Sequence, residues 1–205
     1  MLEITLDSLS RSFADRPALT GISAEIQAGE RLLVRGPNAS GKTTLLKILA
    51  GLLSPTEGSV KVREGLEERD PGWRRRWTGY MAPDLALYEE FSAIENLTFF
   101  ARVRGLARDP DRDLALLSRL GLGKRADDPL GTLSTGLRQR AKLAFAIQAE
   151  PRILLLDEPG SNLDQAGRDL VEETVTTFSN PDTIVVIASN DPSEFGLGTR
   201  TLELA

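Results

Sequence analysis

Residues 36–44 read GPNASGKTT, that is, Gly36, Pro37, Asn38, Ala39, Ser40, Gly41, Lys42, Thr43 and Thr44. This segment fits the pattern G-x-x-x-x-G-K-[ST]. It lies between the segment Arg31–Arg35, whose apolar centre over 32–34 predicts a buried strand, and an apolar-periodic segment over 43–49, which predicts a helix. Glycines let the backbone curl so that successive N–H groups face one phosphate, and the helix adds the positive end of its dipole. The segment therefore predicts a strand–loop–helix unit that binds the phosphates of a nucleotide.

Two side chains would supply the chemistry of this loop. The Lys42 ammonium brings a cation to the β- and γ-phosphates of ATP, and the Thr43 hydroxyl can ligate Mg²⁺. The alternative is a glycine-rich turn that carries a surface lysine. The flanking strand and helix favour the phosphate site, so we expect every residue from 36 to 44 to take part in nucleotide binding.

A pair of carboxylates follows the apolar run over 153–156, which predicts a second buried strand. Asp157 and Glu158 stand at the carboxyl end of that strand, where α/β proteins place their ligand sites. Asp157 can hold Mg²⁺ through water, and Glu158 can orient or deprotonate an attacking water. An acidic turn after a buried strand would explain the same residues without chemistry. Together with the phosphate loop, the pair predicts a metal ligand and a catalytic carboxylate.

The composition excludes several kinds of chemistry. The 205 residues contain no cysteine and no histidine, which excludes disulfides, thiolate metal sites, His-ligated zinc and His-based triads. The formal net charge of −5 disfavours a strongly basic nucleic-acid binder. No apolar run is long enough to span a bilayer. The length predicts one domain over residues 1–205.

Strand and helix patterns alternate along most of the chain, which predicts an α/β fold with a mainly parallel sheet. We expect short strands over 2–6 and 22–26, and a loop over the charged segment 64–76. Further strands are predicted over 59–62, 78–81, 153–156, 183–188 and 200–204. Helices are predicted over 92–104, 110–120, 135–149 and about 165–178, with a short one near 192.

A third motif, Leu133-Ser134-Thr135-Gly136-Leu137, precedes a predicted helix and resembles the LSGGQ signature of ATP-binding cassette (ABC) ATPases. Ser134 and Gly136 match that signature, whereas Thr135 and Leu137 depart from it. The resemblance implies that Ser134 and Gly136 bind the γ-phosphate of ATP held by an opposite subunit. Read alone, a serine before a helix is a simple N-cap.

Other elements of the ABC family occur in the expected order. Phe13 lies where the family has an aromatic residue that stacks on adenine, although a core phenylalanine would read the same way. The segment Ser161–Asp164 resembles the family's D-loop, and Asp164 could equally cap the next helix. The family's Gln-loop glutamine is missing, because Pro83 or Asp84 stands in its place.

The switch histidine of the family is also missing, and Asn190 stands in its place as a candidate catalytic residue. Asparagine can donate one neutral hydrogen bond to a γ-phosphate but carries no charge. Such a bond is about half as strong as a charge-assisted one. Hydrolysis would therefore be slow, or Asn190 would suffice because Glu158 is present, and the sequence leaves both open.

The segment Leu87–Leu97 resembles a stretch of transporter-type cassettes next to the surface that receives the membrane subunit. Tyr88, Phe91, Phe99 and Phe100 could line such a groove, or the last two could belong to the core. The run over 74–76, three arginines between two tryptophans, is compatible with nucleic-acid binding. The acidic composition favours a solvated loop instead.

The resemblance implies a P-loop NTPase fold of ABC type, with a mainly parallel sheet, flanking helices, a small antiparallel β part and a helical subdomain over about 84–148. It implies an ATPase that uses ATP and Mg²⁺ and drives transport together with integral membrane subunits and a second ATP-binding subunit, without nucleic acid. The protein would lie in the cytoplasm, peripheral on the cytoplasmic face of the inner membrane. In its compact length and in the stretch GPNASGKTTLLKILAGLL over 36–53, the chain resembles the haem exporter ATPase of cytochrome c maturation. The alternatives are a soluble ABC ATPase acting on nucleic acid or ribosomes, and a poorly hydrolysing ATP-dependent clamp.

Overall fold

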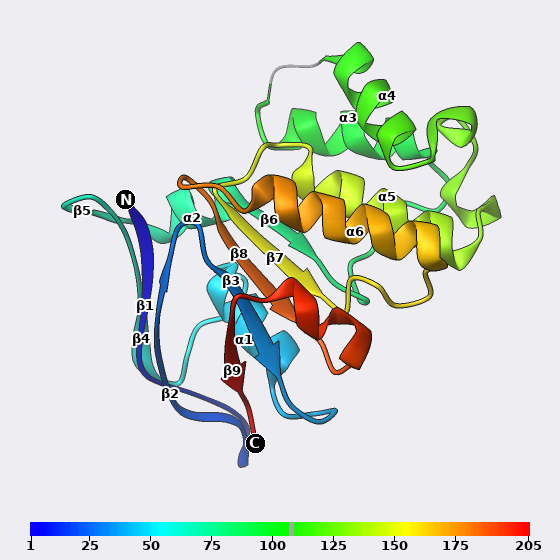
Figure 1. Cartoon of the computed structure of the whole chain (residues 1–205). Helices are drawn as coiled ribbons and strands as arrows, with labels where there is room; N and C mark the ends of the chain where they lie inside the picture. Colours follow the sequence, from blue (N-terminus) through cyan, green and yellow to red (C-terminus); the bar gives the residue numbers. More distant parts are fainter. Residues whose placement is uncertain (107–108) are drawn as a thin grey trace.

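The fold is built on two β-sheets, seen in a computed structural model that describes residues 1–106 and 109–205 (Figure 1). All strand pairs of the larger sheet are parallel, as the sequence predicts. Its order is β6 (Thr78–Met81), β7 (Ile153–Asp157), β8 (Ile184–Ala188), β3 (Arg31–Arg35) and β9 (Arg200–Glu203). Every residue of β7 and β8 is buried, because helices or the second sheet cover both faces.

The second sheet is antiparallel and has the order β2 (Arg16–Gln27), β1 (Leu2–Phe13), β4 (Glu57–Glu64) and β5 (Glu67–Arg69). The expectation of short strands over 2–6 and 22–26 is wrong, because β1 and β2 each run for 12 residues. The polar residues after Leu6 do not end β1. The register shifts between Leu6 and Leu9 instead, and Ser8 takes a positive φ of 47° there.

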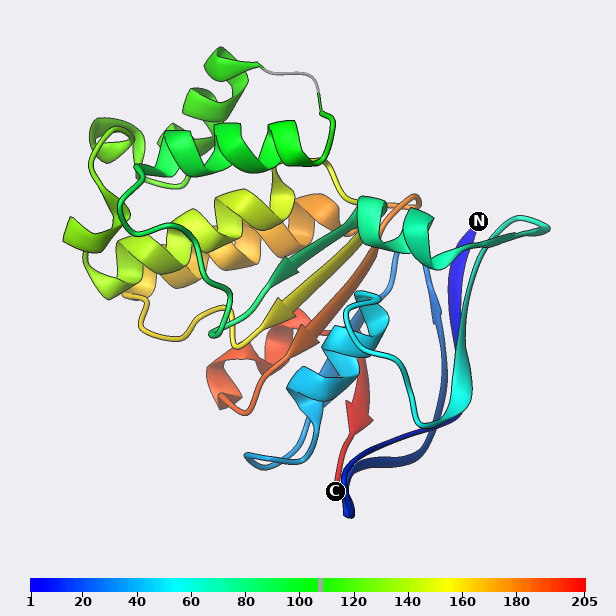
Figure 2. The ribbon, with the colours of Figure 1, turned by 180° about the vertical axis from the view of Figure 1, so that it is seen from behind.

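The parallel sheet divides the core into two parts, one on each of its faces (Figures 1 and 2). The helices are α1 (Lys42–Leu49), α2 (Pro71–Trp77), α3 (Ala93–Val103), α4 (Pro110–Arg119), α5 (Thr135–Ile147) and α6 (Gln165–Phe178). Short 3₁₀ turns are η1 (Gly123–Arg125), η2 (Leu130–Thr132) and η3 (Pro192–Leu197). Along β3, Leu33 faces the core with α3–α6, whereas Leu32 and Val34 face the core with α1 and the antiparallel sheet.

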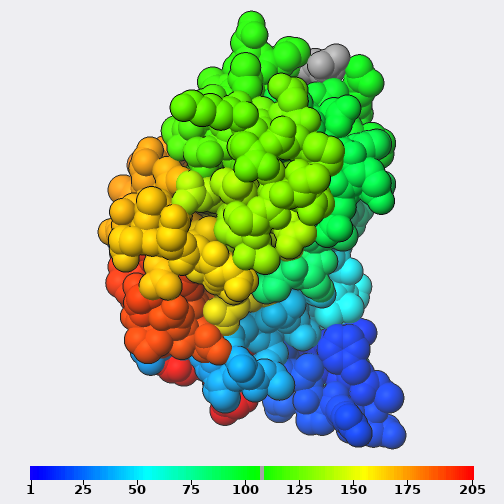
Figure 3. Space-filling view, turned by 90° about the vertical axis from the view of Figure 1, so that its right-hand side faces the viewer, coloured from blue at the N-terminus to red at the C-terminus, as the bar shows by residue number. Residues whose placement is uncertain are grey.

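Helices α3, α4 and α5 come between β6 and β7 in the chain and gather at one end of the molecule (Figure 2). Figure 3 shows this part in green, at the end opposite the blue N-terminal hairpin. A capping box fixes the start of α3: the Ser92 amide donates to Glu95 Oε2 at 2.8 Å, and the Glu95 amide donates to Ser92 Oγ at 3.2 Å.

The prediction of a loop over 64–76 is also wrong, because this segment contains β5 and most of α2. Asp70 caps α2 by accepting a hydrogen bond from the Trp73 amide at 2.8 Å, and Pro71 is the first helical residue. An N-cap aspartate followed by proline is a helix-start signal that high charge density concealed. No helix in the described ranges is both long and apolar enough to cross a membrane.

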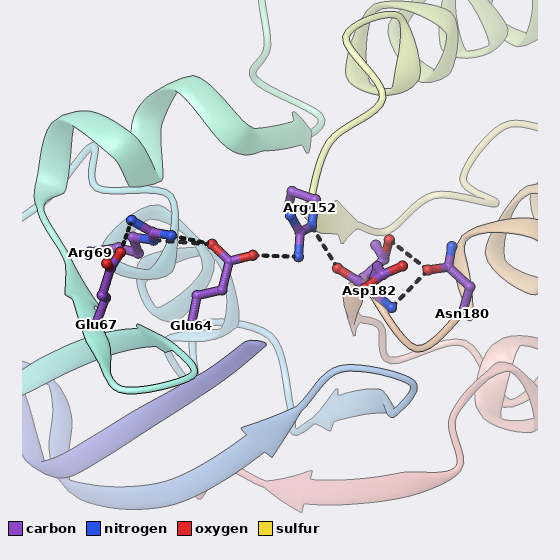
Figure 4. Close-up of polar contacts among 7 residues, drawn as sticks. Glu64, Glu67, Arg69, Arg152, Asn180 and Asp182 are labelled. Atoms are coloured by element: carbon purple, nitrogen blue, oxygen red, sulfur yellow. Dashed lines mark hydrogen bonds and ion pairs between the residues drawn. The ribbon is translucent and has the colours of Figure 1, made fainter. Parts of the chain in front are cut away.

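A network of charged residues ties the edge of the antiparallel sheet to the starts of β7 and β8 (Figure 4). Glu64 Oε2 accepts from Arg69 Nη2 at 2.6 Å, and Glu64 Oε1 accepts from Arg152 Nη2 at 2.9 Å. Arg152 Nε in turn donates to the carbonyl oxygen of Asp182 at 2.8 Å. Hydrogen bonds from Arg69 hold the pKa of Glu64 below its ordinary value of 4.5, against an opposing effect of burial.

Replacing Glu64 by glutamine is expected to destabilise the fold modestly. One partly exposed network of this kind contributes roughly 1 kcal/mol or less, so we expect the melting temperature to fall by up to about 4 °C. Because the folded-state pKa of Glu64 is lowered, its contribution is present above the unfolded-state pKa and is lost as pH falls through the folded-state value. Urea unfolding of wild type and E64Q should therefore give free energies that converge below pH 4.5. A difference that is constant from neutral to acidic pH would contradict this role.

Candidate functional site

The loop between β3 and α1 is a tight backbone curl. Ala39 and Gly41 have positive φ values of 67° and 93°, and the Ser40 amide donates back to the Pro37 carbonyl at 3.2 Å. A Cβ on Gly41 would overlap the carbonyl oxygen of Ala18 on β2, so only glycine fits where the loop meets the antiparallel sheet. Consecutive residues of this kind turn their N–H groups toward one point, which makes an anion-binding concavity.

Lys42 is the first residue of α1, and its side chain is folded across the loop. Its Nζ donates to the carbonyl oxygens of Gly36 at 2.8 Å and Pro37 at 3.1 Å. Lys42 is 7% exposed, and no carboxylate of the described residues pairs with it. The buried hydroxyl of Ser40 also has no hydrogen-bond partner within the described chain. A buried ammonium and a free hydroxyl beside converging amides suit an anionic group.

A hydrogen bond joins the start of α1 to the end of β7. Thr43 Oγ1 donates to Asp157 Oδ2 at 2.6 Å, and Asp157 is 1% exposed. Burial raises the pKa of Asp157, while the Thr43 hydrogen bond and the Lys42 charge lower it. Hydroxyl and carboxylate oxygens are the ligands Mg²⁺ prefers, and Mg²⁺ is usually bound by one or two carboxylates plus substrate phosphates and waters. Thr43 and Asp157 fit that ligand set.

Glu158 follows Asp157 in a strained turn, with φ at +48°. Its amide donates to the Ala188 carbonyl at 2.8 Å, and the Ser189 hydroxyl lies 3.4 Å from Glu158 Oε2. Burial raises the pKa of Glu158, the Lys42 charge opposes that effect, and nearby carboxylates add to it. A half-buried carboxylate with a raised pKa is suited to accept a proton.

One cavity of about 360 Å³ brings the two motifs together. It is lined by Ala18, Asn38, Ala39, Gly41, Lys42, Thr43, Thr44, Pro83, Asp157 and Glu158. Asn190 lies at its border, because its Nδ2 donates to Asn38 Oδ1 at 2.6 Å. The structure therefore places the phosphate loop, both carboxylates and Asn190, two residues after β8, side by side.

Of the predicted loop residues, Gly36, Pro37 and Ser40 do not line this cavity, and three predicted residues outside the loop do not line it either. Phe13 is 47% exposed at the tip of the β1–β2 hairpin, with the Arg11 guanidinium 4.7 Å from its ring centre. Ser134 is exposed and caps α5 by accepting from the Leu137 amide at 3.3 Å. Gly136 faces the segment after β7, since a Cβ there would lie 3.2 Å from the Asn162 carbonyl oxygen. Within one chain, Ser134 and Gly136 do not line the phosphate-loop cavity.

The segment in the Gln-loop position is held by two lysines. Asp84 forms an ion pair with Lys47 of α1 at 2.6 Å. Lys142 of α5 donates to the carbonyl oxygens of Pro83 at 2.6 Å and Ala82 at 3.3 Å. Asp84 is therefore already paired, and Pro83 is the residue of this segment that lines the cavity.

Three buried polar residues of the site do not belong to any motif identified in the sequence. Gln139 of α5 donates through Nε2 to the carbonyl oxygens of Glu158 at 3.2 Å and Pro159 at 3.3 Å. Ser189 is fully buried, and Glu194 of η3 accepts from the Gly160 amide. The only sequence signal for Gln139 is that a polar residue stands on a helix face that is otherwise apolar. No sequence signal points to Ser189 or Glu194.

Four aromatic rings cluster on the helical layer. Tyr88, Phe91 and Phe99 are 46%, 38% and 37% exposed, and their ring centres lie 5.2–6.3 Å apart. Phe100 is partly buried and packs edge-on against Phe145 with ring centres 4.9 Å apart. Three of the four predicted groove residues are thus at the surface, and Phe100 belongs largely to the core.

Comparison with known proteins identifies the family. A family profile described as ABC transporter matches residues 19–161. The uncharacterized ABC transporter ATP-binding protein YxlF of Bacillus subtilis (strain 168) is 38% identical over 80% of this chain. The lantibiotic transport ATP-binding protein SrtF of Streptococcus pyogenes is 31% identical over 93% of this chain and 81% of its own length. This chain spans only 55% of the length of YxlF.

Solved structures show the same architecture. The structure described as the dimeric structure of MJ0796, a bacterial ABC transporter cassette, has a TM-score of 0.87 and 25% identity, over 98% of this chain and 94% of that one. A second structure, described as the dimeric post-hydrolysis state of MJ0796 bound to ADP and Pi, has a TM-score of 0.86. The chain therefore belongs to the ABC transporter family of ATP-binding cassettes and has its P-loop ATPase fold.

Proposed function

We propose that this chain is the ATP-binding and ATP-hydrolysing subunit of an ABC transporter. The observation that carries the proposal is the single cavity in which Lys42, Thr43, Asp157 and Glu158 meet. The phosphate loop supplies amides and a cation, and the end of β7 supplies one carboxylate for a metal and one for a water. Membership of the ABC family supports the choice of ATP as ligand.

Residues 36–44 bind the polyphosphate chain in this proposal. Their amides and the positive end of α1 face the phosphates, and the unpaired Ser40 hydroxyl adds a donor. Lys42 exchanges its bonds to the Gly36 and Pro37 carbonyls for stronger, charge-assisted bonds to phosphate. Thr43 and Asp157 hold Mg²⁺, which when bound neutralises charge on the phosphates.

Glu158 accepts the proton of the attacking water, and its position in a half-buried site supports that role. Asn190 orients the γ-phosphate with a neutral hydrogen bond from its amide group, and Asn38 positions that group. Phe13, exposed at the hairpin tip, stacks on the adenine ring.

A second ATP-binding subunit completes the site. Ser134 and Gly136 lie outside the cavity of their own chain, so they are available to the nucleotide held by a partner. The solved structures of MJ0796 are described as dimeric, which supports this arrangement. The segment over about 84–148 acts as the helical subdomain that carries these two residues.

Membrane subunits are the proposed partners of the aromatic cluster, and the cytoplasmic face of the inner membrane is the proposed location. Exposed Tyr88, Phe91 and Phe99 give an apolar surface suited to a short helix. The names of SrtF and of YbhF, a probable multidrug ABC transporter ATP-binding protein of Escherichia coli (strain K12), point to transport. They do not support the haem-exporter prediction, so we do not extend the proposal to haem.

A second candidate function is a clamp that binds ATP and hydrolyses it poorly. The observation that favours it is Asn190, which stands in the switch position. Its side-chain amide donates a hydrogen bond to Asn38. A neutral amide stabilises a developing phosphate charge less than a charged donor does. Glu158 favours hydrolysis instead, so the two candidates differ in turnover and not in binding.

Lys42→Ala should weaken the binding of ATP at least about tenfold, because a charge-assisted contact to the phosphates is lost. Isothermal titration calorimetry with MgATP measures the effect. Lys61→Ala, which removes an exposed lysine of β4, serves as the matched control and should bind as wild type does. An unchanged dissociation constant for Lys42→Ala, with the fold intact, would refute the phosphate-loop role.

Glu158→Gln keeps the shape of the side chain and removes its basicity. We expect turnover to fall at least about 100-fold and an ATP-bound dimer to accumulate, because general-base catalysis is lost while nucleotide contacts remain. Phosphate release and light scattering measure the two effects. A variant that stays monomeric with ATP and Mg²⁺ counts against the two-subunit site. If wild type and variant both dimerise with ATP and both hydrolyse it equally slowly, the result would favour the clamp.

Asn190→His should raise turnover and introduce a pH dependence. A protonated imidazole donates a charge-assisted bond, and it loses its charge as pH rises through about 6.5. The ratio of variant to wild-type turnover should therefore be larger near pH 6 than near pH 8. Asn190→Ala, which removes the donor altogether, should lower turnover at both pH values. A flat ratio for Asn190→His would exclude a contact between this position and the γ-phosphate.

A further inference from the structure

Glu194 is a buried acid that the chemistry described above does not use. It lies on η3 and is 5% exposed. Its Oε1 accepts from the Gly160 amide at 2.5 Å, and its Oε2 has no hydrogen-bond partner within the described residues. Burial raises the pKa of Glu194, and the hydrogen bond from the Gly160 amide opposes that effect. A buried carboxylate is costly, so its contact with Gly160 needs an explanation.

Gly160 is shaped to receive this carboxylate. Its ideal Cβ position overlaps Glu194 Oε1, so any larger residue at 160 would displace the Glu194 side chain. Gly160 does not have a positive φ, so close approach and not backbone conformation is the reason for glycine here. Glu194 and Gly160 therefore form one fitted contact between η3 and the turn after β7.

That turn contains Glu158, whose positive φ is strained for a residue with a side chain. Such a conformation persists only when the surroundings fix it from several directions. Gln139 of α5 holds the carbonyls of Glu158 and Pro159, and the Glu158 amide donates to Ala188 of β8. Glu194 of η3 adds a third contact, because it accepts the amide of Gly160, two residues after Glu158.

A second set of hydrogen bonds connects η3 to the side-chain carboxylate of Glu158. The fully buried Ser189 lies with its hydroxyl 3.4 Å from Glu158 Oε2, and the Asp191 amide donates to that hydroxyl at 3.0 Å. The Glu194 amide donates to the Asp191 carbonyl at 3.0 Å, which fixes the start of η3. The segment 189–194 thus contacts the Glu158 side chain through Ser189, and it contacts the turn that contains Glu158 through the bond between Glu194 and Gly160.

We propose that Glu194 is a positioning residue for Glu158: its buried carboxylate holds Gly160 and thereby fixes the turn that aims Glu158 at the attacking water. This inference rests on the proposed function, in which Glu158 acts on that water. Because Glu194 contacts the turn and does not line the phosphate-loop cavity, its loss affects the chemical step more than the binding of ATP. A shift of about 1 Å in a catalytic group can lower a rate as much as 100-fold.

The first test compares Glu194→Ala with Glu194→Gln. Glu194→Ala should lower kcat for ATP about tenfold to 100-fold and change KM less than about threefold. Glu194→Gln keeps an oxygen that accepts the Gly160 N–H and should retain at least about half of kcat. Glu172→Ala, which removes an exposed carboxylate of α6, is the matched control and should leave both constants unchanged. Wild-type kcat in Glu194→Ala, or a loss expressed only in KM, would overturn the inference.

The second test is a double-mutant cycle with Gly160→Ala. Gly160→Ala should lower kcat as Glu194→Ala does, because the new Cβ displaces the carboxylate. In the double variant the shortened side chain leaves room for that Cβ, so kcat should be no lower than in Glu194→Ala alone. If the fold-loss of kcat in the double variant equals the product of the two single-variant losses, the two positions do not act together. That result would overturn the inference.

Amide hydrogen exchange separates this inference from the proposed function, because it needs no ATP. By NMR, the Gly160 amide should exchange at least about tenfold faster in Glu194→Ala than in wild type, with protection restored in Glu194→Gln. If wild type does not hydrolyse ATP but exchange behaves as stated, the proposed function fails while the positioning of the turn holds. Equal protection of Gly160 in wild type and Glu194→Ala would overturn the inference whatever the activity.

Discussion

The hydrogen bond from Thr43 Oγ1 to Asp157 Oδ2 joins the phosphate loop to the pair of carboxylates at the end of β7. It connects the start of α1 to the end of β7, two elements that are adjacent in space but separated by more than half of the chain. Parallel strands bring their carboxyl ends to the same edge of a sheet, which is where such residues meet. The parallel sheet is therefore what converts two short motifs into one cavity.

Buried polar side chains give this cavity its shape. Lys42 closes the phosphate loop through the carbonyls of Gly36 and Pro37. Gln139 of α5 and Glu194 of η3 hold the turn that contains Glu158. Each of these groups would be costly to bury without its partner. The strain at Glu158 and the close fit at Gly160 are consistent with a turn fixed from several directions.

Much of the fold was predictable because its signals are local. The prediction of a helix over about 165–178 agrees with α6, since its apolar period and its Asp164 cap are adjacent in the chain. Helix α2 was missed because charge obscured the Asp70 cap, and β1 was cut short because a bulge looks like a strand end. The sequence motifs contain most of the residues that line the cavity, whereas Gln139, Ser189 and Glu194 belong to no motif. Their partners are distant in the sequence, and only the folded chain brings them together.

The central claim is that the backbone amides of the loop between β3 and α1 bind the phosphates of ATP. Titration of ¹⁵N-labelled protein with ATP and Mg²⁺, followed by NMR, tests it most directly. The account predicts that the largest amide shifts occur from Asn38 to Thr44, with a smaller response at Asp157 and Glu158. Saturable binding that leaves these loop amides unshifted, while amides elsewhere respond, would contradict it.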